Sequence, residues 1–200
     1  MKKVLSGICA GIMISIGGTV YLSCDSRYVG AVLFSVALLC ICLKGYSLFT
    51  GKIGFIPEKH GKEEFSVLLL GLLGNAIATI VCGIAIRYCL PAVGDAAYNI
   101  CSAKMELSFG SALIKGIFCG VLMYMAVSIY RDHNKNIAGI LFCIPVFILC
   151  GFEHSIADMF YFAASGIVSF KAFIFILIII LGNAVGGMLP PVLSGALKRE

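Results

Sequence analysis

The stretch Gly151-Phe152-Glu153-His154-Ser155-Ile156-Ala157-Asp158 places glycine and three ionisable side chains inside an apolar run over residues 136–163. Ionisable groups are costly at membrane depth, and irregular backbone is tolerated there only where it is buried in protein or lines a cavity. The run of 28 residues is also longer than one simple span, which needs ~20 residues. We therefore predict a membrane helix that is broken at this stretch.

Composition excludes a soluble domain. Of the 200 residues, 60% are hydrophobic and 12% charged, with a mean hydropathy of +1.05, whereas soluble domains have roughly 45–50% apolar and about 25% charged residues. We expect an all-α membrane protein in which residues 1–200 form a single transmembrane domain, surrounded by lipid and without a nucleic-acid partner. Six apolar runs can span a ~30 Å hydrocarbon core as helices, and they cover residues 4–22, 28–49, 66–86, 109–130, 136–163 and 172–197.

The distribution of cations predicts the orientation. Six spans put both termini on one side, which then carries nine cations against four on the other. The positive-inside rule therefore places both termini in the cytoplasm, with the chain in the cell (inner) membrane. The nine are Lys2, Lys3, Lys52, Lys59, Lys62, Arg131, Lys135, Lys198 and Arg199, and the four are Arg27, Arg87, Lys104 and Lys171.

The two halves of the chain resemble each other. Gly7-Ile8-Cys9-Ala10-Gly11 matches Gly116-Ile117-Phe118-Cys119-Gly120 at a shift of 109 residues, and Leu73-Gly74-Asn75-Ala76 matches Leu181-Gly182-Asn183-Ala184 at a shift of 108. The second apolar run is interrupted like the fifth, by Lys44-Gly45-Tyr46-Ser47. A repeat unit of three spans must insert with opposite orientations. We predict an inverted 3+3 repeat, with halves of about residues 1–105 and 106–200 and with broken second and fifth helices.

His154 is the strongest candidate for chemistry. An imidazole has a reference pKa near 6.5 and can exchange a proton at physiological pH, and ionisable groups within membrane spans are functional by default. Lys115, close to the outer end of the fourth run, can either snorkel to the interface or attract anions to a pore mouth. Glu153 and Asp158 would repel anions, so we assign both to hydrogen bonding with neighbouring helices.

The ten cysteines do not indicate a metal centre or a disulfide scaffold. Nine of them fall in or at the ends of apolar runs, and they form no CxxC pair or Cys/His cluster. We interpret them as small buried hydrophobic residues. We predict neither a metal nor a cofactor.

Three motifs resemble the formate/nitrite transporter family of anion channels, in the right order and over essentially the whole chain. They are Ser47-Leu48-Phe49-Thr50-Gly51 at the second break, Lys115-Gly116-Ile117-Phe118-Cys119 in the fourth run, and Gly151-Phe152-Glu153-His154-Ser155-Ile156-Ala157-Asp158-Met159 in the fifth, with the pairs Gly74-Asn75 and Gly182-Asn183. The chain resembles a short member of that family. It departs at Ser47, where the family often has Glu, and at Gly120 and Asp158, where Asn is common.

The resemblance implies an aquaporin-like bundle, assembled as a homopentamer with one pore through each protomer. It makes His154 the central pore residue, hydrogen-bonded to the hydroxyl of Thr50, and it favours anion attraction for Lys115. From the residues alone, Thr50 could equally cap a helix, and any phenylalanine could face lipid or pack. The family pattern maps the constrictions onto Phe34, Leu38 and Phe147, the cytoplasmic slit onto Leu48 and Phe49, and polar helix packing onto Asn75, Asn183 and Glu153.

We compare three functions. The first is a passive or proton-linked channel for small monovalent anions and their conjugate weak acids, of the formate, nitrite or hydrosulfide class, with proton transfer at His154. The second is an intramembrane acid/base enzyme using Glu153 and His154. It is disfavoured because adjacent helical residues point about 100° apart, and no HExxH or GxSxG motif is present. A purely structural protein would leave the ionisable groups at the breaks unexplained. We predict a channel and not an enzyme.

Overall fold

The computed structural model describes residues 1–58 and 61–197, and in this part of the chain every regular element is a helix. Of the cations used to predict orientation, Lys59, Lys198 and Arg199 lie outside the described residues. The helices long and apolar enough to cross a membrane are five: α1 (Lys2–Ser23), α2 (Arg27–Lys44), α4 (Lys62–Cys89), α6 (Phe109–Asp132) and α9 (Phe170–Leu197). Shorter helices are α3 (Phe49–Lys52), the 3-10 helix η1 (Ile53–Phe55), α5 (Pro91–Met105), α7 (Ala138–Leu149) and α8 (Ser155–Ser165).

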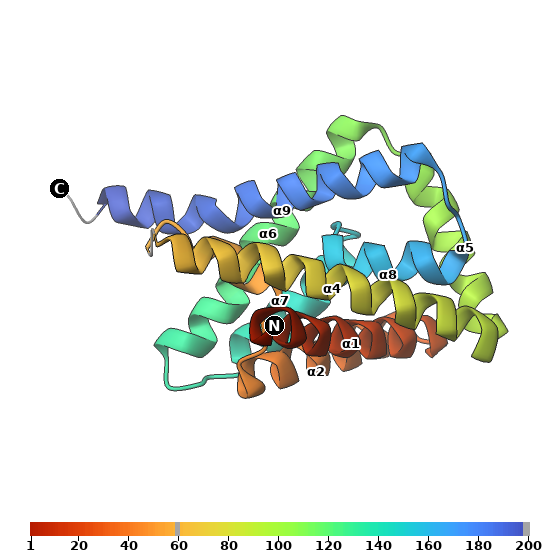
Figure 1. Cartoon of the computed structure of the whole chain (residues 1–200), viewed down its shortest axis with the longest axis horizontal. Helices are drawn as coiled ribbons and strands as arrows, with labels where there is room; N and C mark the ends of the chain where they lie inside the picture. The colour runs from red at the N-terminus through yellow and green to blue at the C-terminus, as the bar shows by residue number, and fades with distance from the viewer. Residues whose placement is uncertain (59–60, 198–200) are drawn as a thin grey trace.

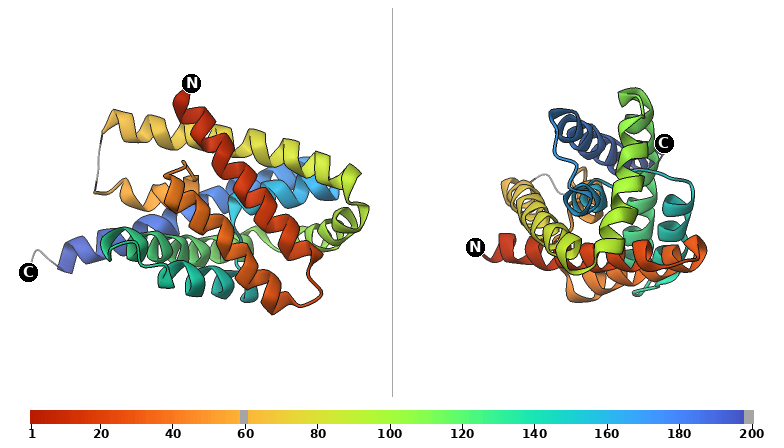
Figure 2. Two further views of the ribbon diagram at one scale, coloured as in Figure 1. Left: turned by 90° about the horizontal axis from the view of Figure 1, so that it is seen from below. Right: turned by 90° about the vertical axis from the view of Figure 1, so that its right-hand side faces the viewer.

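Two pairs of long helices, α1 with α4 and α6 with α9, form the frame of the bundle (Figure 1). Glycines allow each pair to approach closely. A Cβ atom on Gly7 of α1 would collide with the carbonyl oxygen of Gly71 in α4, and one on Gly182 of α9 would lie 2.8 Å from the carbonyl oxygen of Leu113 in α6. Small residues at such crossings are typical of helices packed in membranes. The short helix α8 lies inside this frame, against α4 and α5 (Figure 2).

The second long helix ends at a break where the sequence predicts one. Gly45 follows α2 with a φ of 69°, a left-handed conformation that glycine adopts without the Cβ clash of other residues. The N–H of Tyr46 closes the turn on the carbonyl oxygen of Ile41 at 3.0 Å. The chain then passes through extended Leu48 into α3 and η1. The apolar run over residues 28–49 is therefore not one continuous helix.

The fifth apolar run is also broken. Its first half is α7, of 12 residues, and its second half is α8, of 11 residues, so each is shorter than a span of ~20 residues. Between them Gly151 has a φ of 68°, and the N–H of Phe152 donates to the carbonyl oxygen of Phe147 at 2.9 Å. The break thus lies within the stretch of glycine and ionisable residues that predicted it.

The segment between the third and fourth runs differs from expectation. Arg87 and Lys104 lie between the predicted third and fourth spans, where the sequence predicts no helix, but α4 extends to Cys89 and α5 follows directly, beginning with Pro91. Proline is favoured in the first turn of a helix because its missing N–H would have no partner there. Residues 91–105 are not apolar enough to register as a span, but α5 packs against α8 and buries Ala97 and Cys101. Lys104 therefore belongs to a packed helix.

Candidate functional site

Asn75 ties the first break to the long helices. Its amide nitrogen donates to the carbonyl oxygens of Gly7 at 2.8 Å and of Ser47 at 2.9 Å, while its carbonyl oxygen accepts from the N–H of Phe49 at 3.0 Å. The side chain is fully buried. A single asparagine therefore satisfies backbone groups that the broken helix leaves without partners.

Asn183 does the same for the second break. It donates to the carbonyl oxygens of Gly116 at 2.9 Å and of Glu153 at 2.8 Å, and it accepts from the N–H of Ser155 at 2.8 Å. Like Asn75, it is fully buried. The two asparagines thus make the same kinds of contact in the two halves of the chain, because each holds the residues on either side of a helix N-cap, Leu48 before α3 and His154 before α8.

The second break positions His154 at the N-cap of α8. The Nδ1 atom of its imidazole accepts a hydrogen bond from the N–H of Ala157 at 3.1 Å. Its Nε2 atom lies 2.8 Å from Oγ1 of Thr50, which belongs to α3 at the first break. Both side chains are buried, at 2% and 1% exposure. Two residues 104 positions apart are therefore joined, because the helices that follow the two breaks begin next to each other.

These hydrogen bonds indicate where the imidazole carries its proton. Because Nδ1 faces a backbone N–H, it offers a lone pair, and the proton of the neutral ring lies on Nε2. Nε2–H then donates to Thr50 Oγ1, which leaves the threonine O–H available as a donor. A second proton could bind only at Nδ1, where it would displace the Ala157 N–H at the positive end of α8. The resting imidazole is therefore neutral.

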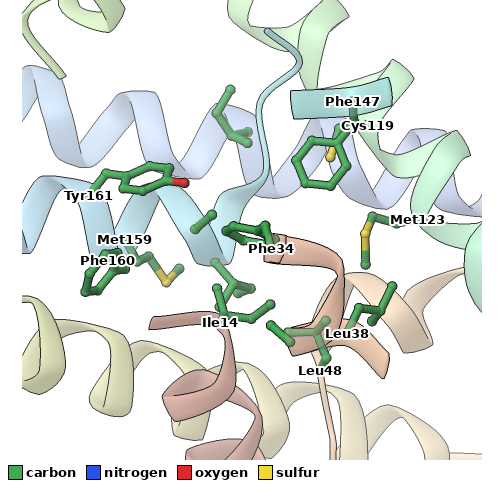
Figure 3. Packing of buried hydrophobic residues seen from close by; sticks show 14 of the residues in the cluster. Ile14, Phe34, Leu38, Leu48, Cys119, Met123, Phe147, Met159, Phe160 and Tyr161 are labelled. Atoms are coloured by element: carbon green, nitrogen blue, oxygen red, sulfur yellow. The ribbon is translucent and has the colours of Figure 1, made fainter. Parts of the chain in front are cut away.

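Large apolar side chains surround this polar pair. Phe147 stacks on the His154 ring with centroids 5.6 Å apart, and Phe34 meets Phe147 edge-on at 6.3 Å. Figure 3 shows Phe34 next to Phe147, and Leu38 next to Leu48. All four apolar side chains are 1–4% exposed. We call Phe34, Leu38, Leu48 and Phe147 the apolar neck.

A cavity lies at each end of the apolar neck. The first, the polar cavity, has a volume of about 370 Å³, and its lining includes Arg27, Lys104, Lys115, Phe147, Glu153, His154 and Asp158. The second cavity has about 250 Å³, and its lining includes Leu38, Leu48, Lys52, Tyr130 and Arg131. Arg27 begins α2 and Lys115 lies early in α6, whereas Arg131 lies at the end of α6. The two cavities therefore occupy opposite ends of the bundle, separated by buried apolar side chains.

The predicted site residues differ in whether they border one of the two cavities. Phe49 is buried at 4% exposure but borders neither of these two cavities, in contrast to Leu48. Lys115 is half-buried and lines the polar cavity, as anion attraction requires. Its ammonium forms no ion pair within the described residues.

The residue that sequence reasoning missed is Lys104. Its ammonium forms ion pairs with Glu153 and, at 3.0 Å, with Asp158 Oδ1, so both carboxylates at the second break have a cationic partner. The sequence predicts that these two carboxylates accept hydrogen bonds from neighbouring helices, and their partner is a cation of α5. A signal was present in the sequence, because two carboxylates in a membrane segment require a counter-ion. Which cation supplies it depends on the position of α5.

An all-helical bundle with five membrane-length helices and a polar centre between two cavities has the architecture of a membrane transport protein. Residues 1–194 match the sequence profile of the family described as formate/nitrite transporter. The chain belongs to this family. It is a multi-pass membrane protein of a transporter family and not an enzyme, which confirms the resemblance noted from the motifs.

Curated relatives are transporters and channels by name. The chain is 29% identical to the uncharacterized transporter YrhG of Bacillus subtilis over 81% of this chain and 68% of that protein. It is 29% identical to formate-nitrite transporter 2 of Toxoplasma gondii, over 82% of this chain and 40% of that protein. It is 27% identical to the nitrite transporter NirC of Salmonella typhimurium, over 66% of this chain and 54% of that protein. The chain therefore spans only part of the length of these relatives.

The fold is also that of a solved channel. A structure described as a pentameric formate channel with formate bound superposes with a TM-score of 0.79 at 24% identity, covering 99% of this chain and 96% of that one. A second structure, described as an FNT family ion channel, superposes with a TM-score of 0.77 at 21% identity, covering 94% of this chain and 84% of that one. At such identity the likeness establishes the fold.

The geometry also argues against the enzyme alternative. The Glu153 carboxylate is engaged by Lys104, while both ring nitrogens of His154 are engaged by Ala157 and Thr50. The two side chains therefore have separate partners and do not act on one point as an acid/base pair.

Proposed function

We propose that this chain is a channel for small monovalent anions and their conjugate weak acids, of the formate, nitrite or hydrosulfide class. The observation that carries the proposal is a neutral imidazole, hydrogen-bonded to a threonine hydroxyl, at the end of an apolar neck. An apolar constriction opposes the passage of a hydrated ion. An anion that gains a proton there becomes a neutral molecule, to which the apolar neck is a much smaller barrier.

His154 is the proposed site of this proton exchange. Protonation at Nδ1 would cost the hydrogen bond from Ala157 and would place a cation in a buried position at a helix N-terminus. An anion beside the ring would offset that cost, so the imidazolium would exist only while an anion is present. The proton can then pass to the anion, and the ring returns to its neutral state. Thr50 would hold the Nε2 side of the ring and donate its own hydroxyl hydrogen to the anion.

The remaining cavity residues fit this proposal. Lys115 would attract anions into the polar cavity, and the apolar neck together with the buried Phe49 would form the constrictions. The architecture we propose is six spans in an inverted repeat, with α7 and α8 together making the fifth. It is supported by the matching hydrogen bonds of Asn75 and Asn183 and by the left-handed glycines at the two breaks.

Assembly and location belong to the same proposal. A homopentamer with one pore per protomer is supported by the likeness to a structure described as pentameric. Placement in the cell (inner) membrane with both termini in the cytoplasm is supported by the cation distribution. Cargo of the formate and nitrite class is supported by relatives named as a formate channel and as nitrite transporters.

Liposomes test the proposal directly. The purified chain, reconstituted and supplied with a panel of formate, nitrite, hydrosulfide and short carboxylates, should carry several of them faster than empty liposomes do. His154→Asn retains size and hydrogen bonding but cannot titrate. It should fold and assemble, yet lose proton-coupled uptake of weak acids and the pH dependence of the maximal rate. Wild-type pH-dependent formate uptake by His154→Asn would refute proton exchange and leave His154 a structural partner of Thr50.

A further inference from the structure

Lys104 holds two buried carboxylates together beside the polar cavity. Its ammonium pairs with Glu153, in the loop before α8, and with Asp158, in the first turn of α8. The side chains of the three residues are 13%, 3% and 1% exposed, in that order. We call them the Lys104 cluster. All three line the polar cavity together with His154.

One oxygen of this cluster has no partner. Asp158 Oδ1 accepts from Lys104, but Asp158 Oδ2 is buried and makes no hydrogen bond within residues 1–58 and 61–197. Glu153 has no such unpartnered buried oxygen in the same part of the chain. An unpaired carboxylate oxygen in a buried position costs free energy, and a proton bound to it removes most of that cost.

The charges of the cluster do not balance. Two carboxylates and one ammonium leave a formal charge of −1 in a buried place, and two carboxylates that share one partner oppose each other's ionisation. One added proton makes the cluster neutral. We propose that the Lys104 cluster is a proton-binding site on the transport path, with Asp158 Oδ2 as the acceptor, whose occupancy controls how readily anions enter the polar cavity. This inference rests on the proposed anion transport.

Other ionisable groups surround Asp158. On α8 and its cap these are His154 and Tyr161. From the other elements they are Tyr21 of α1, Arg27 of α2, Cys101 of α5, and Lys115 and Cys119 of α6. Arg87 of α4 donates to backbone carbonyls at the far end of α8, and Lys171 of α9 donates to the carbonyl of Met105. Lysine and arginine stay charged and tyrosine and cysteine stay neutral in mildly acidic solution, so His154 is the competing group in that range.

The sign of the effect follows from the charge. A falling external pH protonates Asp158 and removes one negative charge from the cavity wall, while Arg27, Lys104 and Lys115 remain positive. The cavity then attracts anions more strongly, so the formate concentration that gives half-maximal uptake should fall. The Lys104 cluster thus acts on entry, whereas His154 acts on passage through the apolar neck and hence on the maximal rate.

The test measures both quantities in liposomes, over the pH range in which formate itself stays ionised. In the wild type the half-saturating concentration should fall as pH falls, by roughly three- to tenfold for one unit charge in a partly hydrated cavity. Asp158→Asn mimics the protonated side chain, so its half-saturating concentration should stay at the low value that the wild type reaches at low pH. Asp95→Asn is the matched control, because Asp95 is an exposed carboxylate on the same helix as Lys104.

The outcomes separate this inference from the proposed function. If Asp158→Asn retains the wild-type pH dependence of the half-saturating concentration, or if Asp95→Asn abolishes it, the inference is wrong. A second outcome is that His154→Asn keeps a pH-dependent maximal rate while Asp158→Asn has a half-saturating concentration that does not change with pH. Proton exchange at His154 is then refuted, and proton binding by the Lys104 cluster is supported. If only His154→Asn loses the pH dependence of the half-saturating concentration, that dependence belongs to His154, and the proposal for the Lys104 cluster is wrong.

A second measurement does not require the variant to fold. Wild-type protein with carbon-13 in its aspartate carboxyl groups can be titrated in liposomes and followed by infrared difference spectroscopy. The chain has four aspartates, and only Asp158 is buried. A protonated aspartic carboxyl band from a water-excluded site should grow as the pH falls over the range used for uptake. If no such band forms in that range, Asp158 is not the proton acceptor.

Discussion

At the scale of single residues, the central question is how a buried imidazole can take part in proton exchange. His154 caps α8 through Nδ1 and meets Thr50 through Nε2, so both of its polar atoms already have partners. Stacking on Phe147 fixes the plane of the ring. A group held this firmly changes its protonation state only when a charged ligand compensates for the cost. This is why we link its protonation to the presence of an anion.

Lys115 gives a prediction at this scale. Replacing it with alanine removes a cation from the wall of the polar cavity, so uptake at low anion concentration should fall by roughly two- to fivefold, with little change at saturation. The difference should shrink as ionic strength rises, because salt screens the potential. The measurement is initial uptake into liposomes at several salt concentrations. Lys171→Ala, which removes an exposed cation outside this cavity, is the control.

If anion flux depends on anion concentration in Lys115→Ala as it does in the wild type, Lys115 does not attract anions, and its side chain only extends to the membrane interface. Its pH response also separates it from the Lys104 cluster. Lys115→Ala should shift the half-saturating concentration equally at every pH, because a lysine stays charged throughout the range, while Asp158→Asn should remove the pH dependence itself.

At the scale of elements, the proposed function depends on the two breaks. A continuous helix would satisfy its own backbone and leave no polar groups at the centre of the bundle. The breaks leave backbone groups without helical partners inside the bundle. Asn75 bonds to the backbone of Ser47 and Phe49, and Asn183 to that of Glu153 and Ser155. Thr50 and the imidazole then face each other. Each break depends on a glycine with positive φ, at Gly45 and Gly151.

Gly151→Ala tests the importance of that conformation. A Cβ atom at Gly151 would have open space around it, so the cost comes from the left-handed backbone alone, about 1–2 kcal/mol. The variant should lose its monodisperse form in detergent at a lower temperature than the wild type. Gly110→Ala is the matched control, because Gly110 also has open space but lies in a right-handed helix, where alanine is favoured. Equal shifts in both variants would contradict this account of the break.

At the scale of the whole molecule, the exposed surface indicates what surrounds the chain. Large apolar side chains such as Phe142, at 73% exposure, and Leu181, at 56%, face outward from the bundle. In a membrane such faces are covered by lipid or by other protomers. The polar cavity and the apolar neck lie within one chain, so in the proposed channel a single chain would hold the whole path.

Native mass spectrometry in a mild detergent tests the proposed assembly. The expected species is about five times the chain mass of 21.3 kDa. His154→Asn should give the same species, because the residue is buried inside one protomer. A monomer or dimer as the largest species at low detergent concentration would count against the homopentamer.

Much of this molecule could be predicted from the sequence because the relevant signals are local. Hydropathy marks a membrane helix, and glycine beside polar residues marks the end of one, so the long helices and both breaks follow from neighbouring residues. The family motifs also predicted the pairing of His154 with Thr50. Residues 91–105 were missed because the helix there owes its place to packing on α8, which no local signal records.

The tertiary structure decided what the ionisable residues meet. Lys104 is 49 residues from Glu153 and 54 from Asp158 in the chain, and only the placement of α5 against α8 joins them. The tautomer of His154 likewise depends on the N–H that α8 presents to Nδ1. Composition determines that a chain lies in the membrane because transfer free energies sum over neighbouring residues. Ion pairs and proton positions depend on distances of about 3 Å between atoms of different helices, and these are set only when the bundle packs.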